Sequence, residues 1–468
     1  MNIYPRSKHT VNGTTVSVVR LPQEDMLLVE GTNPGFTGKE ENGSFLAPQN
    51  HENALLLRKM FPFAAPKPLL TGIRTVGVGD RLGIATPGHL RVFEKYDAIP
   101  VLAQQSIREL NLTNRSFADV LDAASYAVFR EDFQRGFIAD GDHLKTDEEV
   151  EYALSNGYTM ITLDCSEHIR NDVADMTQDE VNAAYKKDET LENLYLGKSF
   201  KVEDATISFP EADFRRTVLI YGKAIDHAVR IYDKYIKGGD VDFEISIDET
   251  MTPTTPAQHY FVASELVRRG VKIVTVAPRF CGEFQKGIDY IGDLKQFEAE
   301  LAIHAAIARH FGYKLSIHSG SDKFSVFPCI GRLTRGNFHL KTAGTNWLEA
   351  MRVVAMTDPA LYREVHAFAL GAFDEATKYY HVTTDLSKIP APDTLSDAQL
   401  PELFKQNDAR QLIHITYGLI LGAKDENGKP RFRDRLYKLW RENGEQYAKC
   451  LEEHIGKHLS MLYQDIEK

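Results

Sequence analysis

Short apolar runs that end in polar residues recur through the middle of the chain. Each is followed by a stretch with apolar residues at helical spacing, and this alternation predicts a parallel β-sheet whose strands are joined by helices. Residues 75–345 hold eight such runs, and eight strands over about 250 residues are typical of an α/β fold of the (β/α)8 TIM-like barrel class. The predicted strands are Thr75–Asp80, Val101–Ser106, Gly136–His143, Met160–Asp164, Asp242–Glu249, Val274–Arg279, Lys314–His318 and Phe338–Thr345.

Three segments do not follow this repeating pattern. Residues 1–70 contain β-like runs separated by turns rich in Gly and Asn, which predicts an N-terminal β-rich addition. The gap after the fourth strand is too long for a simple crossover, so we expect a helical insertion at about 170–240 that partly covers the mouth of the barrel. Residues 391–468 have a helical pattern, and we expect a C-terminal helical extension packed on the barrel. The barrel itself, with its insertion, then spans residues 71–390.

The direction of the inner side chains follows from the two-residue period of a strand. In the string DFEISIDE, Phe243 and Ile245 are apolar and suit the face covered by helices, so Glu244 and Asp248 point into the barrel. Burying many polar side chains there is costly without partners or a ligand, so their convergence near the ends of the strands predicts a site. Asp142 shares a face with the apolar Ile138, which leaves its direction open. The same period places further polar side chains inside: Asp164, Arg279, His318, His339 and Lys341.

Three imidazoles are expected at the mouth of the barrel. His318 and His339 lie on adjacent strands, and His143 follows the third strand, where the chain can turn its side chain inward. Three His ligands with an open position suit a catalytic divalent metal cation such as zinc, nickel, cobalt or manganese. A carboxylate of Glu249 or Glu283 could be a fourth ligand. Other histidines lie in helical stretches and are interpreted as packing or surface residues: His227, His304, His310 and His366.

Composition and charge narrow the class of partner. The formal net charge of the 468 residues is −11, which argues against a nucleic-acid partner because a phosphate-binding face needs an excess of basic residues. No stretch reaches the roughly 18 apolar residues of a membrane helix, and the first residues, MNIYPRSKHT, lack the apolar core of a secretory signal. We therefore expect a cytoplasmic protein with no membrane partner. A homo-oligomer is compatible with the sequence. The four cysteines form no CxxC pair, which supports neither a zinc ribbon nor a disulfide framework.

Several long strings of the sequence are familiar. They are NHENALLLRK, GDRLGIATPGH, AQQS, ADGDH, SIDETMTPTTP, KGIDYIGDL, HSGSDKFSVFP, KTAGTNWLEA and RQLIHITYG, and they run from about residue 50 to 420. On these strings the sequence resembles the tagaturonate epimerase family, which interconverts tagaturonate and fructuronate in hexuronate catabolism. The resemblance implies a divalent metal held by His143 and His318. It also implies that Asp142 is the proton acceptor and Glu244 the proton donor.

The chemistry of such substrates constrains the mechanism. The two sugar acids differ at a carbinol carbon β to the ketone, whose C–H bond is not acidic, so retro-aldol cleavage and re-addition is the expected route. A metal can act as the Lewis acid, and two carboxylates can serve as acid and base. The carboxylate of the small-molecule sugar-acid substrate needs a cation, for which Arg279 and Lys341 are the inward candidates and Lys323 a further one.

Other functions fit the sequence less well. A metal-dependent aldolase or isomerase acting on a related keto sugar acid is the nearest alternative. Metal-dependent hydrolases of the same fold place an HxH pair on the first strand, where this chain has GVGD. A transient oxidation would need a nicotinamide cofactor, but GVGDRLG does not match the GxGxxG fingerprint. A sugar-binding protein without catalysis would not need two acids beside a metal.

Overall fold

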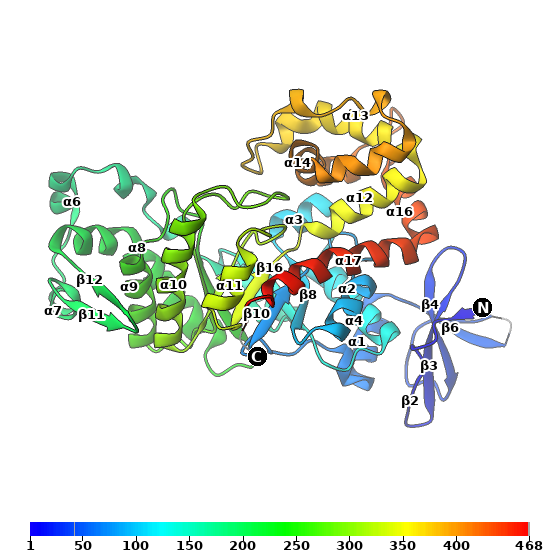
Figure 1. Cartoon of the computed structure of the whole chain (residues 1–468). Coiled ribbons are helices and arrows are strands. Elements are labelled where there is room, and N and C mark those ends of the chain that lie inside the picture. Colours follow the sequence, from blue (N-terminus) through cyan, green and yellow to red (C-terminus); the bar gives the residue numbers. More distant parts are fainter. Residues whose placement is uncertain (42, 467–468) are drawn as a thin grey trace.

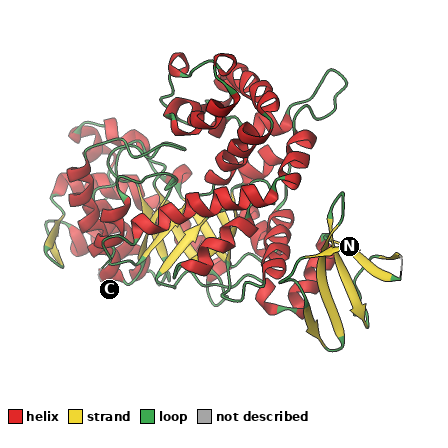
Figure 2. Ribbon diagram, turned by 45° about the vertical axis from the view of Figure 1, so that its right-hand side comes forward, coloured by secondary structure: helices red, strands yellow, loops and turns green. Residues whose placement is uncertain are grey.

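Eight parallel strands close into a barrel in the computed structural model, which describes residues 1–41 and 43–466. Each strand pairs with the next one in the chain, and the last pairs with the first. The predicted fold class is therefore confirmed, and Figure 2 shows the strands behind a layer of helices. The strands are β7 (Arg74–Gly77), β8 (Ile99–Gln105), β9 (Ile138–Leu144), β10 (Met160–Asp164), β13 (Asp242–Ile247), β14 (Thr275–Pro278), β15 (Lys314–Ile317) and β16 (Phe338–Lys341).

Helices surround the barrel because the outward side chains of its strands are apolar. Phe243 and Ile245 of β13, for example, are fully buried in the core between strands and helices. Three of the helices begin at a capping box, in which the hydroxyl of Ser116, Thr146 or Thr255 accepts the backbone N–H three residues later. The helices of this ring are α2 (Thr86–Lys95), α4 (Phe117–Glu131), α5 (Asp147–Ser155), α8 (Glu211–Ile231), α9 (Pro256–Arg268), α10 (Leu294–Phe311) and α11 (Phe327–Leu333). The short helix α3 (Ile107–Thr113) follows β8 and packs against the helical lobe described below.

An antiparallel sheet precedes the barrel, as the sequence predicted. Its apolar face packs on α1 (His51–Met60) and reaches Tyr126 and Phe129 of α4, so the sheet is attached to the outside of the ring (Figure 1). Its strands are β1 (Asn2–Ile3), β2 (His9–Val11), β3 (Thr14–Arg20), β4 (Asp25–Gly31), β5 (Lys39–Glu41) and β6 (Ser44–Pro48).

The segment between β10 and α8 contains two short helices, within the helical insertion expected at about 170–240, and a hairpin that the sequence did not predict. The helices are α6 (Gln178–Ala184) and α7 (Glu189–Tyr195), and the hairpin consists of β11 (Ser199–Val202) and β12 (Ala205–Ser208). The hydroxyl of Tyr195 donates to Glu265 of α9 at 2.7 Å, and the hairpin contacts α9 and α10. These elements therefore pack on the outer ring and not over the mouth of the barrel, where we expected the insertion.

A helical lobe with a core of its own follows the last strand. It consists of α12 (Thr345–Thr357), α13 (Pro359–Ala376), α14 (Asn407–Ile415), α15 (Tyr417–Gly422) and α16 (Arg433–Glu442). Its core contains Trp347 and Trp440, and it joins residues on both sides of the expected boundary at 390. Figure 1 shows α13 and α14 raised above the level of the barrel strands.

The last helix, α17 (Gly444–Leu462), returns to the barrel. It packs against α2, α11 and α12, so it lies on the outer ring where the C-terminal extension was expected. None of the helices in residues 1–41 and 43–466 is both long enough and apolar enough to span a membrane.

Candidate active site

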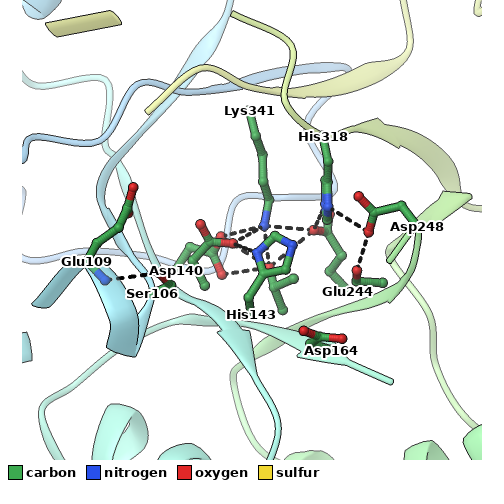
Figure 3. Close-up of polar contacts among 12 residues, drawn as sticks. Ser106, Glu109, Asp140, His143, Asp164, Glu244, Asp248, His318 and Lys341 are labelled. Atoms are coloured by element: carbon green, nitrogen blue, oxygen red, sulfur yellow. Dashed lines mark hydrogen bonds and ion pairs between the residues drawn. The ribbon is translucent and has the colours of Figure 1, made fainter. Parts of the chain in front are cut away.

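The inside of the barrel changes from apolar to polar along its axis. Val101, Ile138 and Met160 form an apolar floor with Leu70. Ile138 therefore points inward, which settles the direction left open by the sequence: Asp140 and Asp142 lie on the inner face above it. Active sites of this fold lie at the C-terminal ends of the strands, and the polar side chains gather there (Figure 3).

Lys341 of β16 lies at the centre of the polar cluster. Its ammonium donates to Asp142 Oδ1 at 2.7 Å, and it lies 3.0 Å from Asp140 Oδ2 and 2.9 Å from Glu244 Oε1. Thr162 Oγ1 is a fourth neighbour at 2.6 Å. The hydrogens of the ammonium are thus directed at groups of the protein, and the side chain is only 5% exposed. Lys341 joins the two predicted catalytic carboxylates, and it is not a free cation for the substrate.

A possible metal site lies beside this cluster. It consists of His143, Asp248 and His318, which each offer a ligand atom within 4.8 Å of the others. The side chains of His143 and Asp248 are 22% and 20% exposed, so this group is open to the mouth of the barrel. His143 Nδ1 lies 2.7 Å from Asp142 Oδ1, and His318 Nε2 lies 2.8 Å from Glu244 Oε1. Each predicted catalytic carboxylate therefore contacts one of the predicted ligands.

A bulge in β9 explains how Asp142 and His143, which are adjacent in sequence, both reach the site. The register to β10 shifts between the pairs Gly141–Ile161 and Leu144–Leu163, which leaves one extra residue in β9. His143 has a left-handed φ of +56°. Bulges of this kind redirect a side chain, and they are frequent beside active sites.

His339, predicted as the third ligand, lies lower in the barrel. It pairs with Ser316 of β15, two residues before His318, and its Nδ1 is 2.9 Å from Thr75 Oγ1. Side chains two residues apart on a strand share a face but not a height, so His339 does not reach the metal group. Asp248 occupies the third position instead. Burial lowers the pKa of His339 to about 3, which makes it a neutral residue of the barrel interior.

Burial and close charges shift the acids of the cluster in opposite directions. Burial raises the pKa of Asp140 to about 7, even though Lys341 favours its ionised form. Burial acts on Asp142 and Glu244 as well, but the neighbouring cations outweigh it and hold the pKa of each well below its usual range. Lys341 is the main cation for both, helped by His143 at Asp142 and by His318 at Glu244.

The charges and donor atoms of this group fit a divalent cation. Asp142, Glu244 and Asp248 are carboxylates, and Lys341 is the one fixed ammonium among them. His318 is buried, yet Asp248 and Glu244 raise its pKa to about 10, so it holds a proton between two carboxylates. A metal ion can replace that proton. Two imidazoles and a carboxylate, with room for further ligands, suit a transition-metal ion.

The other two predicted substrate cations have partners in the protein. Arg279 lines the mouth, and its guanidinium donates to the carbonyl of Thr250. Lys323 is fully buried, and its ammonium donates to the carbonyl oxygens of Gln285, Ile288 and Ser321 at 2.6–2.8 Å. Lys323 therefore connects two loops through hydrogen bonds and is not available to the substrate. Arg279 is partly exposed and lies near the site.

Comparison with known proteins shows the family to which this chain belongs. A family model described as tagaturonate epimerase matches residues 4–462, almost the whole chain. The chain belongs to the tagaturonate epimerase family. The resemblance found in the sequence strings is thereby confirmed.

Individual relatives in this family agree closely. A tagaturonate/fructuronate epimerase from Thermotoga maritima is 45% identical over 425 residues, which cover 89% of this chain and 86% of that protein. The native crystal structure of fructuronate–tagaturonate epimerase UxaE from Cohnella laeviribosi is 52% identical, with a TM-score of 0.97. That alignment covers 98% of this chain and 96% of the other, and a glycerol complex of the same protein gives the same values.

The structure of this tagaturonate epimerase family member also reveals site residues that the sequence analysis missed. A cavity of about 440 Å³ at the mouth is lined by Asp142, His143 and Lys341, and also by Arg81 and His414. Neither of the last two belongs to a barrel strand. Arg81 follows β7 in a loop, and His414 comes from α14 of the helical lobe, so no strand pattern could place them in the site. The lobe thus forms part of the wall of this cavity.

The histidines interpreted as packing residues have surroundings that agree with this role. His304 pairs with His259 in the core at 2.9 Å, and His227 stacks on His168. All four cysteines are free: Cys165, Cys281 and Cys450 are buried, and Cys329 is partly so.

Proposed function

We propose that this chain interconverts D-tagaturonate and D-fructuronate by metal-assisted retro-aldol cleavage and re-addition. Membership of the tagaturonate epimerase family supports the substrate pair. The observation that carries the mechanism is that Asp142 and Glu244 each contact one imidazole of the possible metal site, at 2.7 and 2.8 Å. An acid–base pair therefore flanks the place where the ketone of the substrate would bind.

In this mechanism Asp142 takes the proton of the hydroxyl on the carbon to be inverted. The bond between that carbon and its neighbour on the ketone side breaks, the hydroxyl oxygen becomes an aldehyde, and the electron pair forms an enolate on the ketone fragment. The aldehyde rotates, and the same bond forms again on its other face. Glu244, which is ionised at the start, receives a proton from Lys341 and gives it to the new alkoxide. Bond order and protons balance, and no oxidant is needed.

Lys341 provides the link that this exchange requires. Its ammonium lies 2.7 Å from Asp142 and 2.9 Å from Glu244. It can pass a proton to Glu244 and take one from Asp142, so both carboxylates return to their starting state after each turnover. Proton transfers between positioned groups at such distances are characteristic of general acid–base catalysis.

The metal would be held by His143, Asp248 and His318, and it would supply a Lewis acid that stabilises negative charge on the ketone oxygen. The helical lobe supports an epimerase rather than an aldolase that releases its products. His414 of α14 and Tyr380 after α13 line the cavities at the mouth. These walls can retain the aldehyde while it rotates.

Turnover in D₂O tests the function and the mechanism together. Metal-loaded protein incubated with D-fructuronate should form D-tagaturonate, followed by NMR. Retro-aldol chemistry keeps the hydrogen on the inverted carbon, so that position should stay unlabelled. Deuterium at the inverted carbon would contradict the retro-aldol mechanism, and accumulation of the two fragments would indicate an aldolase. No reaction of D-fructuronate would contradict the function itself.

His318→Ala should lower metal affinity, because it removes one of three ligands. Losing only an outer-shell partner costs about 10–100-fold in affinity, and losing a ligand should cost more. Metal content after dialysis, measured by plasma mass spectrometry, checks this. His339→Asn is the matched control, since His339 is an inward imidazole outside the metal group. Equal metal content in the two variants would contradict the assignment, as would full activity in exhaustively chelated protein.

A further inference from the structure

One corner of the cavity at the mouth is lined by basic and polar side chains from three separate parts of the chain. Arg81 follows β7, Lys286 lies in the loop between β14 and α10, and His414 belongs to α14 of the helical lobe. We call these three residues the basic corner. We propose that the basic corner binds the carboxylate of the sugar acid. This inference rests on the proposed function and adds the group that recognises the acid end of the substrate.

Arg81 is fixed in place but keeps one nitrogen without a partner. Its Nε donates to Glu109 Oε1 at 2.9 Å, its Nη2 donates to the same carboxylate, and the guanidinium stacks 4.1 Å above the ring of Tyr417. Only 2% of the residue is exposed, and Nη1 has no hydrogen-bond partner. A buried N–H group without a partner is costly. The structure therefore holds a charged donor ready for an acceptor from outside the protein.

His414 supplies a second unpartnered group beside Arg81. It is 1% exposed, and neither ring nitrogen has a hydrogen-bond partner. Its ring fits between Gly287 and Gly344, where an added Cβ would come within 2.9 and 2.3 Å of it, so both glycines keep space for the imidazole. Burial, together with nearby Arg81 and Lys286, holds the pKa of His414 well below its usual range. The neutral ring has one N–H to donate.

Lys286 completes the corner and connects it to the metal site. Its ammonium donates to Ser319 Oγ at 3.0 Å, directly after the predicted ligand His318. Burial, with the cations Arg81 and Arg108 nearby, lowers the pKa of Lys286, although Glu109 acts in the opposite direction. Glu109 balances one of these positive charges. An anion bound here would remove the remaining repulsion.

The polarity of the cavity agrees with a substrate that has an acid at one end. Figure 3 shows Glu109, the partner of Arg81, on the opposite side of Lys341 from Asp248. Asp248 of the proposed metal group thus lies at one side of Lys341, and Glu109, to which Arg81 donates, lies at the other. Lys341, predicted from the sequence as a substrate cation, already has three carboxylate partners. In the basic corner, by contrast, Arg81 and His414 have donors without a partner. Hydrogen bonds from a charged donor to a carboxylate are stronger than those between neutral groups.

Binding of two unreactive ligands tests the basic corner without relying on turnover. D-gluconate and D-glucitol are open-chain six-carbon compounds without a ketone, so retro-aldol cleavage cannot occur, and only gluconate carries a carboxylate. Calorimetric titration of the metal-loaded chain should show gluconate binding at least about 10-fold more tightly than glucitol, the factor expected for hydrogen bonds to a charged group. Equal affinities would overturn the proposal.

Two variants locate the preference. Arg81→Met combined with Glu109→Gln removes the free N–H groups while keeping the net charge of the corner, and Lys286→Met removes a charge at a partly exposed position. Each should reduce the preference for gluconate by about 10-fold or more. Arg435→Met is the control, because Arg435 pairs with Glu364 on the exposed side of the lobe and should leave the preference intact.

The outcomes separate this proposal from the proposed function. Circular dichroism confirms that each variant is folded, and Lys286→Met decides the question if the double variant does not fold. A gluconate preference that survives in the folded variants would overturn the assignment to the basic corner. The variants could lose the gluconate preference as expected while the unmodified chain leaves fructuronate unchanged. That result would support binding at the basic corner and contradict the epimerase function.

Discussion

Replacing Glu244 by Gln should lower turnover by about 10²–10⁴-fold, the usual range for losing a general acid or base. Gln has nearly the same shape, but it cannot give or take a proton, and it removes the charge between Lys341 and His318. Glu244 is not one of the proposed ligands, and a Gln side chain can still hydrogen-bond to His318, so metal content at saturating metal should be unchanged. The measurement is the rate of interconversion of fructuronate and tagaturonate at saturating substrate, with metal content determined in parallel.

Glu167→Gln is the matched control for this variant. Glu167 lies near the mouth, 3.5 Å from Lys145, but its side chain is 64% exposed, and no step of the mechanism uses it. The turnover of Glu167→Gln should stay close to that of the unmodified chain. If Glu244→Gln were as active as this control, Glu244 would not be an acid–base residue. If Glu244→Gln lost the metal, its effect would report on metal binding instead.

The second large effect is expected for Lys341→Met. This change removes the cation between Asp140, Asp142 and Glu244 and leaves three buried carboxylates facing one another. Breaking a buried ion pair by removing one partner costs about 3–5 kcal/mol, because the other charge stays buried without compensation. We therefore expect the free energy of unfolding to fall by about that amount, and activity to be lost. Urea denaturation and the turnover assay measure the two effects.

Lys145→Met removes the same charge at a less critical place. Lys145 lies 3.6 Å from the buried Asp164, but its own side chain is 32% exposed, so water screens its charge and the loss should be smaller than that of Lys341→Met. Equal stability of the Lys341 and Lys145 variants would show that the buried cluster does not depend on Lys341 for its charge balance. Loss of stability together with full activity would contradict the proton link between Asp142 and Glu244.

The barrel could be predicted because its strands are buried on both faces in a regular way. In β13, apolar and polar residues alternate, and this pattern alone showed which side chains point inward. The hairpin of β11 and β12 gave no comparable signal, since half of its residues are exposed. Its turn contains Glu203 with a φ of +49°, a position where a Gly or Asn would have marked the turn in the sequence.

The sequence predicted which strand face each site residue occupies. It did not predict the level of the residue along the barrel axis or the side chains with which it pairs. The two-residue period correctly placed His339 and Lys341 inside, but it could not show that His339 lies a layer below His318. Nor could it show that Lys341 is already paired with carboxylates. Asp142 and His143 reach the same site through a bulge, which breaks the period on which such predictions rest. His414 reaches the site only through the packing of the helical lobe on the barrel.

The position of α17 also affects how the chain is made. All eight barrel strands have been synthesised once β16 is complete, but α17 follows only after the helices of the lobe. It covers α2 from the start of the barrel and α11 from its end, and it buries Leu451, Ile455 and Leu459 between them. During translation, therefore, the seam between the two ends of the barrel stays uncovered until α17 has left the ribosome. For a nascent chain, this delay is the interval in which apolar surface is exposed to chaperones and to neighbouring chains.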